Sequence, residues 1–226
     1  MTLFSPDWFA ALAAIVLIDL VLAGDNAIVI ALAARNLPDT LRKRAVLWGT
    51  VGAIVVRAAM TLVTLWLLKI PGLMLAGGLG LVWIAYRLLV PADDGDDHGT
   101  PAASFWGAMK TIVIADALMG IDNVLGVAGA AHGDMTLVIL GLLISVPIVV
   151  AGSSVVLRLI DRFPVIVQLG AAVLAFTAAK MIVAEPLLDA VFDPHALARW
   201  ALYALLIAGV LLAGRWAQAR RQPAET

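Results

Sequence analysis

Seven apolar segments, each about as long as a bilayer is thick, run through this sequence and limit what it can fold into. A helix needs about 20 apolar residues to span the hydrocarbon core. Hydrophobic residues make up 63% of the 226 residues and charged residues only 14%, and the mean hydropathy is +1.02, outside the range of soluble domains. The predicted spans are 9–34, 46–68, 72–90, 108–131, 136–157, 165–184 and 197–214. We therefore predict an all-α polytopic membrane protein whose 226 residues form a single transmembrane domain.

The distribution of lysine and arginine predicts the orientation. Most of these residues lie in or beside the first, third and fifth connections and in the C-terminal tail, and such residues mark the cytoplasmic side. The N-terminus is therefore expected outside and the C-terminus in the cytoplasm, which requires an odd number of spans. The near-neutral net charge of −1 gives no sign of nucleic-acid binding, and the absence of cysteine excludes disulfides and thiolate metal sites.

An internal repeat divides the chain. Asp19–Asn26 and Asp116–Asn123 both read Asp, five residues, Asp-Asn, with an offset of 97 residues. A second match, 77–90 with 170–183, has an offset of 93. Each half then holds three spans, and because three is odd, the halves must be inverted across the membrane. This architecture is typical of transporters, with the binding site near the midplane between the repeats.

The repeat predicts the internal organisation of the domain. The first repeat covers 1–90, an acidic cytoplasmic linker covers 91–107, the second repeat covers 108–184, and a seventh helix follows at 195–216.

The two motifs bring six polar side chains to the middle of apolar spans. Four buried carboxylates cannot share a low-dielectric site while all are ionised and unpaired, so the site needs a cation, protons or both. Carboxylate and carboxamide oxygens suit a hard divalent ion such as Mg²⁺, Ca²⁺ or Mn²⁺. The predicted metal site between the 9–34 and 108–131 spans consists of Asp19, Asp25, Asn26, Asp116, Asp122 and Asn123.

Helix geometry sets a condition on this site. At about 100° per residue, Asp19 and Asn26 share a face, whereas Asp25 is turned away from it. All three can reach one ion only if the helix is broken nearby, and Gly24 is the expected place, with Gly120 in the second motif.

Two further residues are accessory candidates. Arg57 lies mid-way along the 46–68 span, and an intramembrane arginine normally faces the protein interior and pairs with acids. It is expected to offset charge of the cluster or to act as a gate, unless it forms a fixed structural pair. Met119 lies between Asp116 and Asp122, where a thioether would favour Mn²⁺, although packing is the commoner role of methionine.

The motif segments DLVLAGDNAIVIALAARNLP and DALMGIDNVLGVAGAAHGD resemble the TerC family of integral membrane proteins, in particular its short YjbE-like bacterial branch, which is placed near the LysE superfamily of exporters. The resemblance implies seven spans, a bacterial cytoplasmic (inner) membrane location, and a role in Mn²⁺ export and metal homeostasis. It also implies that the six motif residues form the metal site. The choice of Mn²⁺ among hard ions comes from the resemblance alone.

These features predict a secondary-active divalent metal exporter, not an enzyme, that needs no cofactor. No nucleotide-binding loop is present, and the surplus carboxylates suggest exchange against protons. The expected partners are the metal ion, protons and the lipid bilayer, with homo-oligomer formation left open.

Export of another cation, including Ca²⁺, Mg²⁺, an organic cation or an amino acid, is the alternative. An intramembrane aspartyl protease, with paired acids on two spans, is a remote one.

Overall fold

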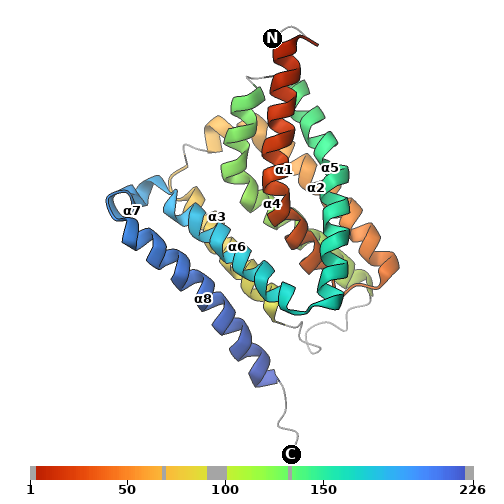
Figure 1. Ribbon diagram of the computed structural model, residues 1–226, viewed down its shortest axis with the longest axis vertical. Coiled ribbons are helices and arrows are strands. Elements are labelled where there is room, and N and C mark those ends of the chain that lie inside the picture. Colours follow the sequence, from red (N-terminus) through yellow and green to blue (C-terminus); the bar gives the residue numbers. More distant parts are fainter. Residues whose placement is uncertain (1–3, 68–69, 91–100, 132–133, 222–226) are drawn as a thin grey trace, which may run out of the picture.

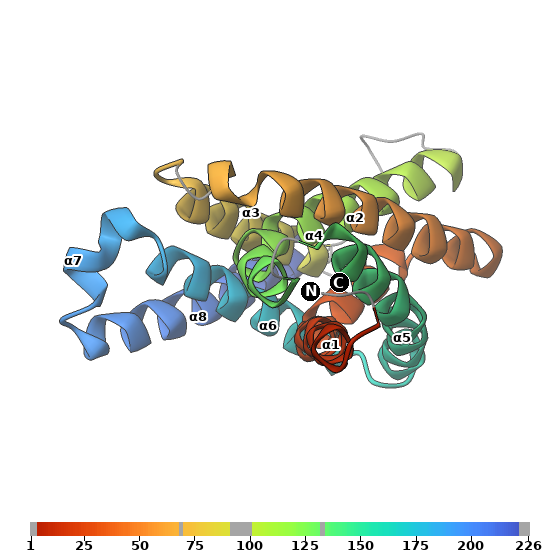
Figure 2. The same ribbon diagram turned by 90° about the horizontal axis from the view of Figure 1, so that it is seen from above.

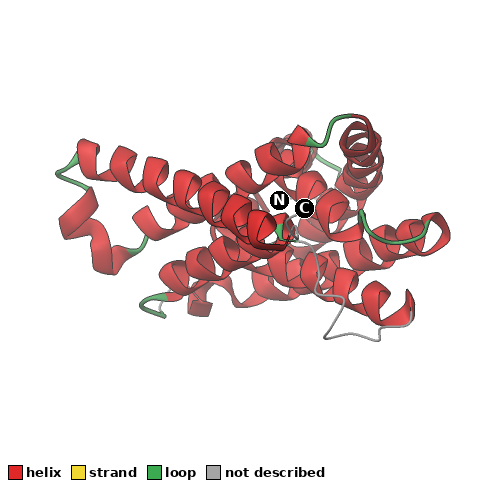
Figure 3. Ribbon diagram, turned by 90° about the horizontal axis from the view of Figure 1, so that it is seen from below, coloured by secondary structure: helices red, strands yellow, loops and turns green. Residues whose placement is uncertain are grey.

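The computed structural model describes residues 4–67, 70–90, 101–131 and 134–221, and every regular element in these ranges is a helix (Figure 3). The long helices fall on the seven apolar segments (Figure 1). Two short helices that hydropathy did not predict, η1 and α7, join α6 to α8. The helices are α1 (Pro6–Ala34), α2 (Asp39–Leu67), α3 (Leu73–Leu89), α4 (Pro101–Ala131), α5 (Met135–Arg162), α6 (Val165–Val183), the 3-10 helix η1 (Pro186–Leu188), α7 (Asp189–Phe192) and α8 (Ala196–Arg221).

Several helix ends extend past the apolar segments. The first turns of α2 lie before residue 46, where the sequence becomes apolar, and α5 continues to Arg162. α4 begins at Pro101, within the predicted linker, while 91–100 lie outside the described residues. Hydropathy finds the apolar part of a helix, whereas backbone hydrogen bonding continues into its polar ends.

The long helices have the properties of a polytopic membrane protein. Among the described residues, four stretches are long and apolar enough to cross a bilayer: Asp39–Thr61, Met135–Arg162, Val165–Val183 and Ala196–Arg220. α1 adds a fifth when its two parts are taken as one bent span, and α3 is apolar but shorter, at 17 residues. This bundle of apolar helices establishes an all-helical multi-pass membrane protein.

α1 bends where its motif lies. The parts Pro6–Leu20 and Gly24–Ala34 meet at 46°, so the expected distortion next to Gly24 is present. It is a bend and not an unwound segment, because the backbone stays helical from Pro6 to Ala34.

The helices pack in pairs drawn from the two halves of the chain. α1 packs on α5, α2 on α4, and α3 on α6, while α1 and α4 meet in the centre. Seen from above, α1 and α5 lie together on the opposite flank from α2 (Figure 2). α8 lies outside this bundle, along α6 and α3 (Figure 1).

Glycines allow the closest of these approaches. A Cβ atom on Gly49 of α2 would lie 2.8 Å from Ile112 Cδ1 of α4, and one on Gly141 of α5 would collide with the Ile15 side chain of α1. Both isoleucines are fully buried. Small residues at these crossings let the helices approach closely, as is usual inside membranes.

A buried carboxylate ties the end of α6 to the start of α3. Gly72, the N-cap of α3, has φ of +83° and offers no capping side chain. Glu185, which is 1% exposed, accepts hydrogen bonds instead from the backbone N–H groups of Gly72 (2.8 Å), Met74 (3.1 Å) and Leu75 (3.3 Å). A carboxylate at a helix N-terminus satisfies donors that have no intrahelical partner and interacts favourably with the helix dipole.

The surroundings of Glu185 also shift its proton equilibrium. Burial alone raises the pKa of the carboxyl, but hydrogen bonds from four backbone N–H groups outweigh burial, so the pKa of Glu185 lies below its ordinary value of 4.5. A carboxyl whose pKa is lowered in the folded state contributes its full stabilisation at pH values above its ordinary pKa. It loses that contribution as the pH falls through the folded-state pKa.

Glu185→Gln is therefore expected to lower the free energy of unfolding by about 1–3 kcal/mol at neutral pH, because an amide cannot satisfy the same N–H groups as two carboxylate oxygens. Unfolding of the purified protein in detergent between pH 7 and pH 3.5 measures this. The difference from wild type should shrink at the acid end, and the exposed Asp193→Asn serves as control. A difference that grows as the pH falls would contradict the assignment.

Candidate metal-binding site

A cavity of about 30 Å³ lies between α1, α2, α4 and α5, in the interior of the bundle. This volume exceeds the roughly 10–15 Å³ that one water molecule requires. Aliphatic side chains form most of the wall, and no aromatic ring is among the lining residues that the structure describes. The polar lining residues are Asp19, Asn26, Thr50, Arg57, Asp116 and Ser145.

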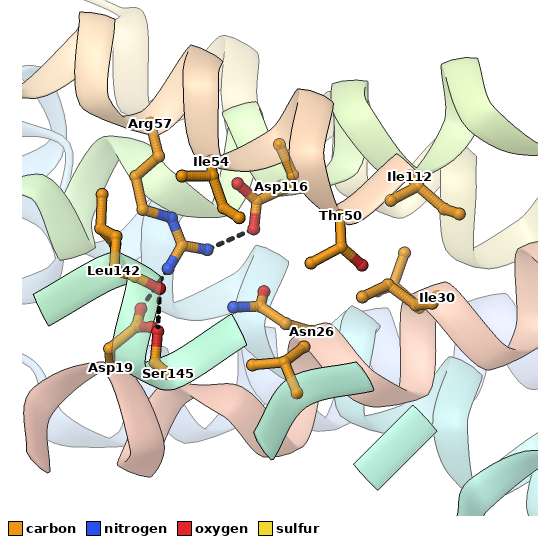
Figure 4. Close-up of a pocket in the computed structure, with 13 residues that line it drawn as sticks. Asp19, Asn26, Ile30, Thr50, Ile54, Arg57, Ile112, Asp116, Leu142 and Ser145 are labelled. Atoms are coloured by element: carbon orange, nitrogen blue, oxygen red, sulfur yellow. Dashed lines mark hydrogen bonds and ion pairs between the residues drawn. The ribbon is translucent and has the colours of Figure 1, made fainter. Parts of the chain in front are cut away.

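Arg57 joins the two motifs at this cavity. Its Nη1 donates to Asp19 Oδ1 of α1, and its Nη2 donates to Asp116 Oδ1 of α4 (Figure 4). The three side chains are 4–11% exposed. In an apolar surrounding the ion pairs offset the cost of burying the charges, and each partner depends on the others. Arg57 therefore lies in the interior and pairs with one acid of each motif, a pairing that the sequence had left open.

Some oxygen atoms at the cavity remain without a partner. Asn26 Oδ1 and Asp116 Oδ2 are buried and accept no hydrogen bond from the described residues. The hydroxyls of Thr50 and Ser145 donate to backbone carbonyls of their own helices, which leaves their lone pairs available. The cavity therefore offers carboxylate, carboxamide and hydroxyl oxygens, the donor set that hard divalent cations prefer.

The six predicted ligands do not all converge. Asp19, Asn26 and Asp116 lie together, as the repeat predicted. Asp25 is half-buried and points elsewhere, accepting a hydrogen bond from Thr177 Oγ1 of α6 at 2.9 Å. Asp25 was assigned to the site on the condition that the helix breaks near Gly24. Because α1 bends but stays helical, Asp25 remains turned away from Asp19 and Asn26 and does not line the cavity. Within the described part of the chain, no three His, Cys, Asp or Glu side chains lie close enough together to hold a metal ion.

Three other sequence-predicted residues have different positions. Asp122 and Asn123 lie on α4, but their side chains are outside the described residues. Met119 is 2% exposed and belongs to the apolar core shared by α3, α4 and α6. It packs there and is not part of the cavity wall.

Apart from Arg57, the residues that form the α2 and α5 walls were not part of the predicted site. Thr50, Ala53 and Arg57 line one side, and Leu142, Ser145 and Val149 line the other. Both sets follow helical spacing of three and four residues. This spacing is visible in the sequence, but long apolar helices carry several such faces, and only the packing selects one.

Comparison with known proteins identifies the family. The model of the integral membrane protein TerC family matches residues 4–222. The chain is also 40% identical over 212 residues to the membrane protein YjbE of Bacillus subtilis (strain 168), covering 94% of this chain and 97% of that protein. This chain belongs to the TerC family.

More distant relatives match this chain over part or most of their own length. The inner membrane protein YgdQ of Escherichia coli (strain K12) is 24% identical over 207 residues, which is 84% of either chain. The inner membrane protein YoaE of the same strain is 26% identical over 186 residues, 74% of this chain but 36% of that protein. No solved structure matches the chain.

Loss of Arg57 should leave two buried carboxylates without a cation. We expect Arg57→Gln to destabilise the protein by about 3–5 kcal/mol, and Asp19→Asn to be less harmful in the Arg57→Gln background than in wild type. Unfolding of the four proteins in detergent gives the coupling energy. Arg42→Gln is the matched control, because its partners Asp39 and Asp161 are 86% and 59% exposed and such pairs contribute about 0–1 kcal/mol. Additive effects of the two substitutions would contradict the pairing.

Proposed function

We propose that this TerC-family protein is a secondary-active exporter of a divalent metal ion, most directly Mn²⁺, with the cavity between α1, α2, α4 and α5 as its substrate site. The observation that carries the proposal is the burial of Asp19 and Asp116 beside one cavity, with a cationic group already between them. Intramembrane carboxylates are costly and normally serve an ion path or a proton relay. An ordinary structural salt bridge does not require one acid from each motif.

The contacts support two inverted repeats of three spans, followed by a seventh. Gly49 lies against Ile112, and Gly141 lies against Ile15. The isoleucines are 97 residues apart, the same offset as Asp19 and Asp116, and the glycines are 92 apart. If the two halves of the chain are exchanged, the Gly49–Ile112 contact becomes the Gly141–Ile15 contact. The same exchange turns the α2–α4 pair into the α1–α5 pair. In this arrangement the site lies at the repeat interface near the midplane.

The nature of the cavity favours a small ion. Pockets for organic ligands are often lined by aromatic side chains, whereas the described walls of this cavity are mostly aliphatic and include no aromatic ring. This argues against an amino acid or another organic cation. The oxygen donors accept Mg²⁺, Ca²⁺ or Mn²⁺, and Mn²⁺ is proposed from the family resemblance.

The arrangement also argues against a protease. Paired catalytic aspartates share a proton directly, but here the guanidinium of Arg57 lies between Asp19 and Asp116 and contacts both. We therefore propose a transporter and not an enzyme.

We further propose an inner-membrane location, with the N-terminus outside and the C-terminus in the cytoplasm. Two E. coli relatives are inner membrane proteins by name. Contacts gather several basic helix ends at one end of the bundle: Arg42 of α2 pairs with Asp161 of α5 at 3.7 Å, and Arg215 of α8 donates to Gln168 of α6 at 3.3 Å. Basic residues on one side mark the cytoplasm.

Transport of Mn²⁺ into inside-out vesicles tests the proposal. Wild type should accumulate Mn²⁺, and Asp116→Asn should lower the initial rate by about tenfold or more, since a lost charged contact is worth 1.5–3 kcal/mol. The degree to which excess Mg²⁺ or Ca²⁺ inhibits Mn²⁺ uptake measures the ion selectivity. Asp193→Asn, an exposed change of the same chemistry, should transport as wild type does. Absence of uptake by inserted, folded wild type would refute the function.

Coupling to protons is a separate part of the proposal. The two motifs carry four carboxylates, of which Asp19 and Asp116 line the cavity. We propose that the remaining motif acids, Asp25 and Asp122, carry the protons that exchange for metal. An acidic vesicle lumen should raise the initial rate of Mn²⁺ uptake, and collapse of the pH gradient with an ionophore should remove the increase. If the initial rate of Mn²⁺ uptake does not change with the imposed pH gradient, protons are not the coupling ion. The protein would then be a uniporter or would exchange Mn²⁺ for another ion.

A further inference from the structure

Arg57 lies where a bound cation would be expected. Of the lysines and arginines whose side chains the structure describes, it alone is buried. One terminal nitrogen contacts the Asp19 carboxylate and the other contacts the Asp116 carboxylate (Figure 4). A divalent ion that drew the same two oxygens together would compete with the guanidinium for this position.

The atoms around Arg57 point to a second cation. Asn26 is 5% exposed and its Oδ1 accepts no hydrogen bond from the described residues, and the same holds for Oδ2 of the buried Asp116. Both residues line the cavity. Buried acceptors without a donor are unfavourable, and a hard cation in the cavity would satisfy them. Arg57 thus neutralises the site only in part and leaves oxygen donors next to an available space.

The second half of the chain has no counterpart of this arginine. The cavity residues of α2 and α5 correspond at an offset of 92, so that Thr50 matches Leu142 and Ala53 matches Ser145. At the same offset, Arg57 matches Val149, which lines the opposite wall. The carboxylates come from both halves, but the cation comes from one, so Arg57 does not follow from the repeat and has a role specific to the site.

We propose that Arg57 is a tethered counter-cation that is displaced from Asp19 and Asp116 when the metal ion binds and returns when the ion leaves. This inference rests on the proposed export function. Arg57 is then not a ligand of the metal but a competitor that sets its affinity. The long, flexible arginine side chain allows the exchange without a large movement of the backbone.

The consequence concerns the empty transporter. A carrier of this type must change conformation both with and without its substrate. Without metal and without Arg57, Asp19 and Asp116 would face each other unpaired in a low-dielectric site, and any state that buries them would be strongly disfavoured. With Arg57 paired to both carboxylates, the empty carrier can return to its starting conformation. Net export then needs no other cation to neutralise Asp19 and Asp116.

Removing Arg57 should therefore separate two activities. We compare wild type, Arg57→Gln and Arg57→Lys in proteoliposomes, with Arg42→Gln as control. Net uptake is measured with Mn²⁺ outside only, and exchange is measured with labelled Mn²⁺ outside and unlabelled Mn²⁺ on both sides. Mn²⁺ affinity is measured by titration calorimetry in detergent.

For Arg57→Gln we expect Mn²⁺ binding roughly tenfold tighter or more, within the usual 5–150-fold range of coupling between two ligands. The ratio of net uptake to exchange should fall, because net uptake needs the return of the empty carrier whereas exchange does not. Because Mn²⁺ replaces the lost positive charge, it should also raise the melting temperature of Arg57→Gln more than that of wild type. Arg57→Lys should show the same changes to a smaller degree, because an ammonium does not reproduce the planar, two-armed contact.

Other outcomes overturn the inference. Equal or weaker Mn²⁺ binding by folded Arg57→Gln, or loss of net uptake and exchange in equal proportion, would make Arg57 a ligand or a fixed structural pair. If Arg57→Gln does not fold, the Arg57→Lys variant decides. An Mn²⁺ affinity equal to that of wild type would then also make Arg57 a ligand or a fixed structural pair. If wild type transports Mn²⁺ and only these results fail, the export function stands and the inference does not. If wild type neither binds nor transports Mn²⁺, both fail.

Discussion

Burial of charge inside an apolar helical bundle is the constraint on which the rest of this structure depends. Asp19, Arg57 and Asp116 are each nearly inaccessible to solvent, and none could remain ionised there alone. Their mutual pairing fixes which faces of α1, α2 and α4 turn inward. The apolar residues could be buried in many rotations of these helices, but only some rotations bring three charged groups together. The triad therefore contributes specificity to a bundle whose other contacts are largely aliphatic.

The packing around the triad uses small residues and few polar contacts. Gly49 and Gly141 let α2 approach α4 and α5 approach α1, so that the cavity has walls from four helices and remains small. At the other end of the molecule, Glu185 fastens the start of α3 to the end of α6 through backbone hydrogen bonds. α3 and α6 thus form a firmly joined pair, against which α8 rests. The helices that hold the cavity and the pair that holds α8 are stabilised by different interactions.

The chemistry of the site follows from where its oxygen atoms come from. A carboxylate from each motif, a carboxamide from one and two hydroxyls surround a space of about 30 Å³. Asp25 is separated from this group and contacts Thr177 on α6. The motif acids therefore divide between at least two environments, one beside Arg57 and one between α1 and α6. The proposed transport function assigns the metal to the first environment, and the sequence motif alone does not make this division.

The sequence by itself determined the membrane class, the positions of the long helices and the pairing of the two motifs. Hydropathy over about 20 residues and the repeated Asp-x5-Asp-Asn pattern are local properties, and they predicted that Asp19, Asn26 and Asp116 would meet. The predicted site also included Asp25, Asp122 and Asn123, but Asp25 lies outside the cavity because α1 bends without unwinding. Only the tertiary structure decided that Arg57 binds both motif acids, that Met119 packs in the core, and that α2 and α5 close the cavity. In a helix that is apolar on most sides, periodicity leaves the inward face open, because hydrophobic residues suit both lipid and core. The rotation of each helix is then set by contacts between residues far apart in the chain, which no local pattern records.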